Sequence, residues 1–463
     1  MKIAGGMKIS DAGLTPKQRW TIVALLSASI TINLLDRQTL SVLAPLLREQ
    51  WKWTNAQYAY IAVAFNLGMM IGQIPAGTLM DRVGTRIGLP IIFVSWSVLC
   101  ALHAFAGPGT SLEAIATAVY SFVPGVPAVA AGLAGFIVLR FLMGVSECGN
   151  YTAGIKALAG LFPPETRSRA GGFFNAGAQF GSVVAPSLIL SFLIVKLGVG
   201  WQMAFIIPAA LGLLWLGPWF AVFPDKETMT AIAIKPAALR EPQGRPEHGR
   251  GAGTPAAAIQ NVGLGQLMSN HKVLGLFLIR AFSGPITTFY WTWLPLYLRT
   301  GRGLTLFATG FFASVPNLIG MSGNIVGGLL TDRFVKSFGT DRGRKLAFVC
   351  AFSLGALSMT MPWVRNDYLA VVLMGLALFG NQWVAAAYIG TVGDVVPQQL
   401  AGRVNGIAGF GDNGAATLAV LFTGVIVDRY GWSNVFIGAG ALPLFAMLSL
   451  FLVLRRIEPA RFR

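Results

Sequence analysis

The chain has 463 residues, of which 54% are hydrophobic and only 11% are charged. Soluble globular proteins carry about 25% charged residues, so this composition excludes an ordinary soluble protein and indicates one that crosses a membrane many times. The formal net charge of +17 at first suggests a nucleic-acid partner. The basic residues follow the pattern of membrane topology instead, and we expect no nucleic acid.

Twelve apolar stretches along the chain are long enough to cross a bilayer, which takes about 20 residues. They lie at residues 20–43, 57–79, 87–106, 130–160, 169–195, 200–223, 272–298, 305–331, 346–364, 368–393, 403–427 and 433–454. Segment 107–128 is ambiguous, and one interpretation of it is a surface helix in a longer loop. The pattern predicts an all-α membrane protein with twelve transmembrane helices.

A polar segment rich in Pro, Gly, Ala and Arg separates the first six stretches from the last six. Such a composition has little to bury and predicts a mobile linker. We therefore expect an N-terminal six-helix bundle over residues 1–223, a linker over 224–270 and a C-terminal six-helix bundle over 271–463.

The loop charges predict the orientation of the chain in the membrane. Of the 35 Lys and Arg residues, 24 fall in the alternate segments that include both termini and the linker, and seven fall in the opposite loops. By the positive-inside rule, both termini and the linker are cytoplasmic, in a multi-pass protein of the cell's inner membrane. The first apolar stretch, after Lys17 and Arg19, is too long for a cleavable signal.

Two adjacent charges, Asp36 and Arg37, interrupt the first apolar stretch. A charge at the centre of a spanning helix costs roughly 2.5–3.5 kcal/mol, so each of them needs a polar surface to face. Neighbours in a helix point about 100° apart, so they cannot pair with each other. An acid and a base side by side at this depth indicate a coupled transport site.

The cysteines and histidines do not suggest a metal site. Cys100, Cys148 and Cys350 all lie in apolar stretches, and we expect free thiols. The three histidines are scattered, so we expect no metal and no cofactor. The sequence also lacks a nucleophile–base constellation, which argues against an enzyme.

A short motif recurs at the ends of three predicted helices, as GTLMDRVGTR, GLLTDR and GVIVDRYG. In the first copy, Gly77 permits close helix contact, Asp81 can pair across the interface between bundles, and Arg82 and Arg86 can anchor the cytoplasmic rim; the third copy lies on the outer side. The residues that we assign to a gating motif are Gly77, Asp81, Arg82, Gly84, Arg86, Asp332 and Arg333. The alternative is that these charges only set the topology. Separately, Gly177-xxx-Gly181 and Gly323-xxx-Gly327 predict helix-packing surfaces.

The GxxxDRxGxR motif, its weaker copy, the twelve stretches and the linker resemble the major facilitator superfamily over nearly the whole chain. Finer resemblance lies in N-x-x-DRQTLSVLAP of the first stretch, in residues 140–186 and in residues 280–298. These segments look like the anion:cation symporter branch, and most like its transporters of hexuronates and related sugar acids. Gly284 stands where that branch often carries an aspartate, and Asp412 has no counterpart that we expect.

This resemblance implies roles for five charged residues. Arg37 or Arg140 would bind the substrate carboxylate, Arg280 would be an additional candidate, and Asp36 and Glu147 would carry protons. A guanidinium binds a carboxylate through two parallel hydrogen bonds and stays charged, which suits an anionic substrate. The bland alternative is structural pairing, for example of Arg37 with Glu147.

The remaining candidates are one acid and several neutral side chains. Asp412 is either a third titrating or hydroxyl-binding group, or a satisfied polar contact. Further substrate-binding candidates are Gln179, Tyr290, Asn381, Gln382, Trp383 and Asn413. For any single aromatic among them, packing or an interfacial belt is the commoner explanation.

We therefore predict a proton-coupled symporter that imports a small organic anion, a hexuronate or aldonate sugar acid, by alternating access between its two halves. Coupling to Na⁺ in place of H⁺ stays open, and we expect a monomer in the lipid bilayer. The alternative is an exporter or antiporter of another organic anion or amphipathic compound. A receptor without transport has no appended signalling domain to support it.

Overall fold

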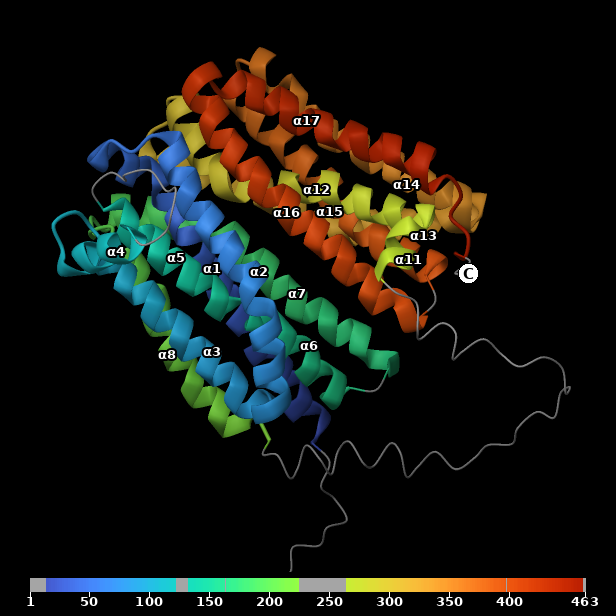
Figure 1. Ribbon diagram of the computed structural model, residues 1–463, viewed down its shortest axis with the longest axis horizontal. Helices are drawn as coiled ribbons and strands as arrows, with labels where there is room; N and C mark the ends of the chain where they lie inside the picture. Colours follow the sequence, from blue (N-terminus) through green and yellow to red (C-terminus); the bar gives the residue numbers. More distant parts are fainter. Residues whose placement is uncertain (1–13, 122–131, 163, 225–263, 397, 461–463) are drawn as a thin grey trace, which may run out of the picture.

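The structure is a computed structural model that describes residues 14–121, 132–162, 164–224, 264–396 and 398–460. Within these ranges the regular structure is helical throughout (Figure 1). The first group of long helices comprises α1 (Pro16–Trp51), α2 (Asn55–Val83), α3 (Thr85–Leu102), α5 (Leu133–Glu147), α6 (Gly149–Leu161), α7 (Pro164–Pro186) and α8 (Met203–Val222). The second comprises α12 (His271–Leu296), α13 (Leu306–Phe338), α14 (Thr340–Gly355), α15 (Asp367–Val395), α16 (Gln398–Tyr430) and α17 (Trp432–Ser449).

Shorter helices complete several of these elements. The short α4 (Ser111–Ser121) lies between α3 and α5 with most of its side chains exposed or half-buried, which agrees with a surface helix in segment 107–128; the rest of that segment, from residue 122, lies outside the described residues. A six-residue helix, α11 (Leu264–Ser269), precedes α12. The 3₁₀ turns η2 (His103–Phe105) and η5 (Ala356–Trp363) and the π-helical segments η3 (Ser187–Lys196), η4 (Tyr297–Gly301) and η6 (Leu450–Leu454) extend longer helices.

The described part of the chain contains ten helical segments that are long and apolar enough to cross a membrane. Six of them join two elements; for example, α5 and α6 form one segment around Cys148, and α7 continues into η3. The helices α1 and α2, with 36 and 29 residues, also exceed the roughly 20 residues that a bilayer requires. They pack against α7 and α5 respectively, inside the first group.

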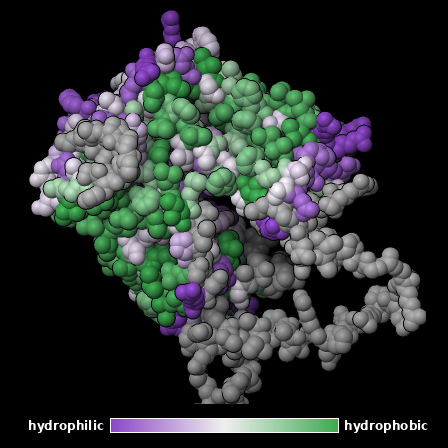
Figure 2. All heavy atoms as spheres, viewed as in Figure 1, coloured by the Kyte–Doolittle hydropathy of each residue, from purple (hydrophilic) through white to green (hydrophobic). Residues whose placement is uncertain are grey.

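The molecular surface has the distribution of polarity that a bilayer favours. Figure 2 shows hydrophilic residues gathered towards two ends of the molecule and hydrophobic residues over much of the surface between them. Large apolar side chains such as Leu214, Leu329 and Ile389 are 71%, 67% and 74% exposed. Contiguous apolar surface of this kind is rare on soluble monomers, and lipid chains would cover it.

The repeated sequence motif ends its three helices with the same backbone geometry. Gly84, Gly339 and Gly431 follow α2, α13 and α16 with φ angles of +80°, +78° and +77°. Side chains with a Cβ rarely adopt this region, so glycine at these positions stops the helix at little cost. The sequence repeats therefore correspond to structural repeats.

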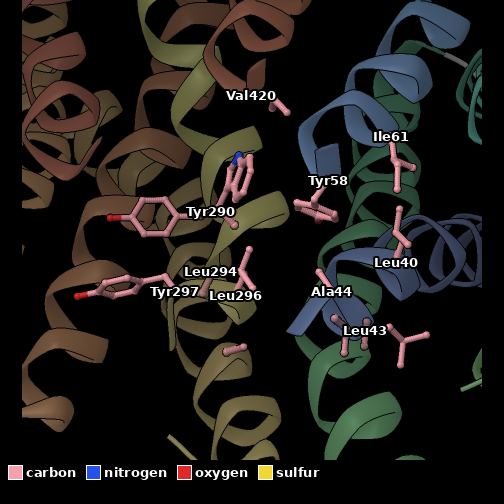
Figure 3. Close-up of a cluster of buried hydrophobic side chains, with 14 of the residues drawn as sticks. Leu40, Leu43, Ala44, Tyr58, Ile61, Tyr290, Leu294, Leu296, Tyr297 and Val420 are labelled. Atoms are coloured by element: carbon pink, nitrogen blue, oxygen red, sulfur yellow. The ribbon is translucent and has the colours of Figure 1, made fainter. Parts of the chain in front are cut away.

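The two groups of helices meet at the end of the molecule where α1 ends and α2 begins, which we call the Trp51 end. There Leu40, Leu43 and Tyr58 of the first group lie opposite Leu294 and Leu296 of the second in a buried apolar cluster (Figure 3). The hydroxyl group of Tyr58 donates to the carbonyl oxygen of Thr292 over 2.9 Å. Burial of this apolar surface holds the two groups together.

Polar contacts surround that cluster. The carboxylate of Asp428, at the end of α16, accepts hydrogen bonds from the backbone N–H of Asn55 over 3.0 Å, from its side chain over 2.6 Å and from the N–H of Ala56 over 2.8 Å. It therefore caps the N-terminus of α2 from the other group, where the helix dipole favours an anion. Nearby, Arg299 binds Glu49 through two hydrogen bonds of 2.8 and 3.3 Å.

Candidate functional site

A cavity of about 320 Å³ lies between the two groups of helices and is the candidate site. Its volume is at the lower end of the range typical of small-molecule pockets, about 300–1,000 Å³. The three arginines predicted for substrate binding, Arg37 of α1, Arg140 of α5 and Arg280 of α12, all line it, together with Asp412 of α16. Residues from four helices therefore bring an excess of positive charge to one cavity.

On one wall, Arg37 and Arg140 lie side by side. Their guanidinium carbons are 5.1 and 5.8 Å from the centre of the Phe65 ring, and Nη1 of Arg140 donates to the carbonyl oxygen of Arg37 over 3.2 Å. Nε of Arg37 donates to Oε2 of Glu147 over 3.2 Å, and the Glu147 side chain is fully buried. The structural pairing considered for these two residues is thus present in this conformation.

Two guanidinium nitrogens of Arg140 are buried without a hydrogen-bond partner in the described part of the chain. Among the described residues, no side chain or backbone group accepts a hydrogen bond from its Nε or its Nη2, although the residue is only 2% exposed. A buried unpaired donor is costly, and a bound carboxylate would satisfy both of these nitrogens at once. The unpaired Nε and Nη2 of Arg140 are therefore a candidate binding site for an anion.

The two acids predicted to carry protons lie behind this wall. Neither Asp36 nor Glu147 is among the residues that line the cavity, and both are buried, with 0% and 1% exposure. The Asp36 carboxylate and Oε1 of Glu147 have no hydrogen-bond partner within the described ranges. In this conformation the cavity therefore reaches neither carboxylate.

On the opposite wall, Nη2 of Arg280 donates to Oδ2 of Asp412 in a direct ion pair. The guanidinium of Arg280 also lies 5.5 Å from the centre of the Tyr388 ring. The sequence did not decide whether Asp412 is a functional group or a satisfied polar contact. In the structure Asp412 has an arginine partner and also lines the cavity.

Neutral polar side chains occupy the space between the two walls. Asn381 and Gln382 of α15 and Asn413 of α16 line the cavity. Nδ2 of Asn381 donates to the Thr287 hydroxyl over 2.5 Å, and Nε2 of Gln382 donates to Oε1 of Gln179 over 3.3 Å. These amides can hydrogen-bond the hydroxyl groups of a sugar.

Three other predicted binding residues do not line the cavity. Tyr290 points into the second group and bonds the Ser358 hydroxyl over 2.7 Å (Figure 3). Trp383 donates from its indole N–H to the hydroxyl of Thr331 over 2.8 Å, and Gln179 reaches the cavity only through Gln382. In this conformation these side chains pack within the bundles or support other residues.

Several lining residues that the sequence did not predict carry hydroxyl groups, which are common in apolar stretches and do not stand out there as charges and amides do. The cavity is also lined by Ser41, Ser283, Thr287, Thr288 and Thr292. A signal for the threonines was available, since positions 280, 284, 287, 288 and 291 share one face of a helix. If Arg280 faces a cavity, residues at these spacings on the same face of the helix are expected to line that cavity too.

The residues of the predicted gating motif that are described with their surroundings do not line this cavity. The side chains of Gly77 and Asp81 are outside the described part of the structure, so their roles stay predictions. The side chains of Arg82, Asp332 and Arg333 are exposed at the ends of α2 and α13, and Gly84 turns the chain between α2 and α3. The carbonyl oxygen of Arg86 accepts a hydrogen bond from the indole N–H of Trp219 over 3.1 Å.

The chain is similar in sequence to a known family and to several transporters. The sequence profile of the Major Facilitator Superfamily matches residues 26–340 and 337–463. The hexuronate transporter of Escherichia coli K12 is 29% identical over 439 residues, which cover 94% of this chain and 91% of that protein. A probable galactarate/D-glucarate transporter of Bacillus subtilis is 27% identical over 463 residues, covering 97% and 95% of the two chains.

A solved structure shows the same fold. The crystal structure of a bacterial homologue of the human lysosomal transporter Spinster, in an inward-facing and unoccupied conformation, superposes with a TM-score of 0.69 at 13% identity. The superposition covers 96% of this chain and 98% of the other. The resemblance seen in the sequence to superfamily transporters of sugar acids is confirmed, and the chain belongs to the major facilitator superfamily, whose members are membrane transporters and not enzymes.

Proposed function

We propose that this protein is a proton-coupled symporter that imports a small sugar-acid anion, a hexuronate or an aldonate, across the inner membrane. The observation that carries the proposal is the unpaired guanidinium fork of Arg140 in a cavity between the two helical groups. Similarity to transporters named for hexuronates and for galactarate and glucarate supports a sugar-acid substrate.

The proposed topology has twelve spans, in which α1 and α2 join the ten apolar segments. Residues 1–223 and 271–463 form the two six-helix halves, joined by the cytoplasmic linker 224–270, and both termini are cytoplasmic. The excess of Lys and Arg in the corresponding segments supports this orientation. It puts the Trp51 end outside, so the conformation described is closed towards the outside.

The proposed coupling depends on the Arg37–Glu147 pair. While Glu147 is ionised, it holds Arg37 at 3.2 Å. A proton on Glu147 removes that attraction and lets Arg37 join Arg140 at the substrate carboxylate. Asp36, buried on the same wall, is the second proposed proton carrier. The gating motif around Asp81 would hold the cytoplasmic side when the halves rock the other way.

Uptake by the purified protein in proteoliposomes tests the proposal. An imposed inward pH gradient should drive accumulation of D-galacturonate or D-galactonate, and an equal Na⁺ gradient at constant pH should not. The Glu147→Gln variant should keep counterflow exchange of the same anion but lose accumulation driven by the pH gradient, because it has no proton to carry. Equal loss of both activities would contradict the proton-carrier role of Glu147, and accumulation without either gradient would contradict symport.

A further inference from the structure

The wall of the cavity formed by α12 and α16 contains a carboxylate side chain next to its arginine. Arg280 and Asp412 form an ion pair there, and their side chains are 27% and 16% exposed. Both residues line the cavity. The positive charge of Arg280 is therefore already neutralised by the protein before any substrate binds.

The pair depends on a missing side chain at position 284. Gly284 lies one helical turn after Arg280 on α12 and also lines the cavity. A Cβ atom at this position would overlap Oδ1 of Asp412. The Asp412 carboxylate therefore occupies the space that a side chain at 284 would fill, and glycine is what allows it to reach Arg280.

The opposite wall has room for one carboxylate. Arg37 and Arg140 lie against the same ring of Phe65, and one guanidinium nitrogen of Arg140 is bonded to the Arg37 backbone. Two groups so close together serve a single anion. The unpaired nitrogens of Arg140 mark where it binds.

From this arrangement we infer that Asp412 is a specificity-determining residue that restricts the site to monocarboxylate sugar acids and rejects dicarboxylates. With one carboxylate at Arg140, the far end of a substrate extends towards the Arg280–Asp412 pair. A neutral hydroxyl group there can donate to Asp412 and accept from Arg280, whereas a second carboxylate meets a carboxylate already in place. The inference rests on the proposed function and assigns a residue to the exclusion of dicarboxylates.

The similarity to known transporters does not decide this question. The two relatives described above carry names from both classes, since hexuronates have one carboxylate, and galactarate and glucarate have two. The identities of 29% and 27% are too close to favour either. The inference that monocarboxylates are preferred to dicarboxylates rests instead on the charge of Asp412 and on the absence of a side chain at Gly284.

The test compares two linear probes that differ only at one end, D-galactonate with a terminal CH₂OH group and galactarate with a terminal carboxylate. Binding of each to the purified full-length protein is measured by calorimetry. The wild type should bind galactarate at least about tenfold more weakly than galactonate, and Asp412→Asn should shift the ratio of the two Kd values by about tenfold towards galactarate. Gly284→Ala should shift it in the same direction, because its methyl group displaces the Asp412 carboxylate.

A matched control removes the same charge elsewhere. Asp367 of α15 pairs with Arg302 over 3.5 Å outside the cavity, and Asp367→Asn should leave the ratio unchanged. If the wild type binds galactonate but neither Asp412→Asn nor Gly284→Ala moves the ratio, the inference is wrong and the proposed function stands. If the wild type binds both probes equally, the inference is also wrong. If it binds neither these probes nor D-galacturonate, the proposed function itself falls.

Discussion

In the proposed function, Arg140 is the residue on which anion binding depends most directly. Its guanidinium is anchored by one hydrogen bond to the Arg37 backbone, and its other two nitrogens are buried without a partner among the described residues. Lysine carries the same charge but cannot form the two parallel hydrogen bonds of a guanidinium. We predict that Arg140→Lys weakens binding of D-galacturonate by more than about tenfold, measured by calorimetry on the purified protein.

A second arginine of the same half serves as the control. Nε of Arg48 donates to the carbonyl oxygen of Trp53 over 3.0 Å, away from the cavity. Arg48→Lys should keep the wild-type affinity, which separates the loss of the fork from a general effect of replacing an arginine. Wild-type affinity in Arg140→Lys would show that the carboxylate binds elsewhere.

The sequence could predict which charged residues matter but not their partners. Arg37, Arg140 and Arg280 stand out because a full charge inside an apolar stretch is costly. The pairing of Arg37 with Glu147 could be named as one possibility, since both lie in spans. The pairing of Arg280 with Asp412 was not among the predictions, although both residues also lie in predicted spans. Nothing local in the sequence relates residues that are 110 or 132 positions apart, so neither pairing could be established without the folded chain.

The contact between α2 and α5 positions this binding wall through glycines. A Cβ atom at Gly144 of α5 would collide with the backbone of α2 at Phe65 and Met69, and one at Gly68 would collide with the backbone of α5 at Phe141. The two helices therefore approach at backbone distance, which brings Phe65 under Arg140. Small residues at helix interfaces in membranes allow this packing.

Separating these two helices should therefore damage both stability and binding. We predict that Gly144→Val costs about 1–3 kcal/mol of stability and weakens D-galacturonate binding, because Arg140 moves off its support. Thermal unfolding and calorimetry on the same sample measure the two effects. Gly438→Val of α17, where a Cβ would meet no atom within 4 Å, is the matched control. A Gly144→Val protein as stable as the control would show that α2 and α5 tolerate a wider separation.

The helices themselves were largely predictable, whereas their interruptions were not. Gly177 and Gly181 pack against the backbone of α1, and Gly323 packs against the backbone of α15, as their spacing predicts. The break at Cys148 and the π-helical segment after Pro186 change the pattern of backbone hydrogen bonds. Apolar periodicity carries no signal for such a change, because the side chains remain apolar on both sides of it.

Across the whole molecule, long-range contacts were the least accessible to sequence reasoning. The division into two groups of helices follows from the apolar stretches and the polar segment between them. The cap that Asp428 provides for α2 joins residues 373 positions apart, and the motif GVIVDRYG gives no indication of its partner. Only the folded chain shows that this aspartate helps to hold the Trp51 end closed.

In the proposed topology, closure at the Trp51 end would leave the cavity accessible only from the cytoplasmic face of the membrane. A cysteine at Asn413, in the cavity, should therefore react rapidly with a charged, impermeant thiol reagent in inside-out vesicles and slowly in right-side-out vesicles. A cysteine at Asn434, exposed near the Trp51 end, should show the opposite preference. Wild-type protein, in which Cys100 and Cys148 are buried, gives the background. Equal reaction rates from the two faces would mean that the resting population is not confined to this conformation.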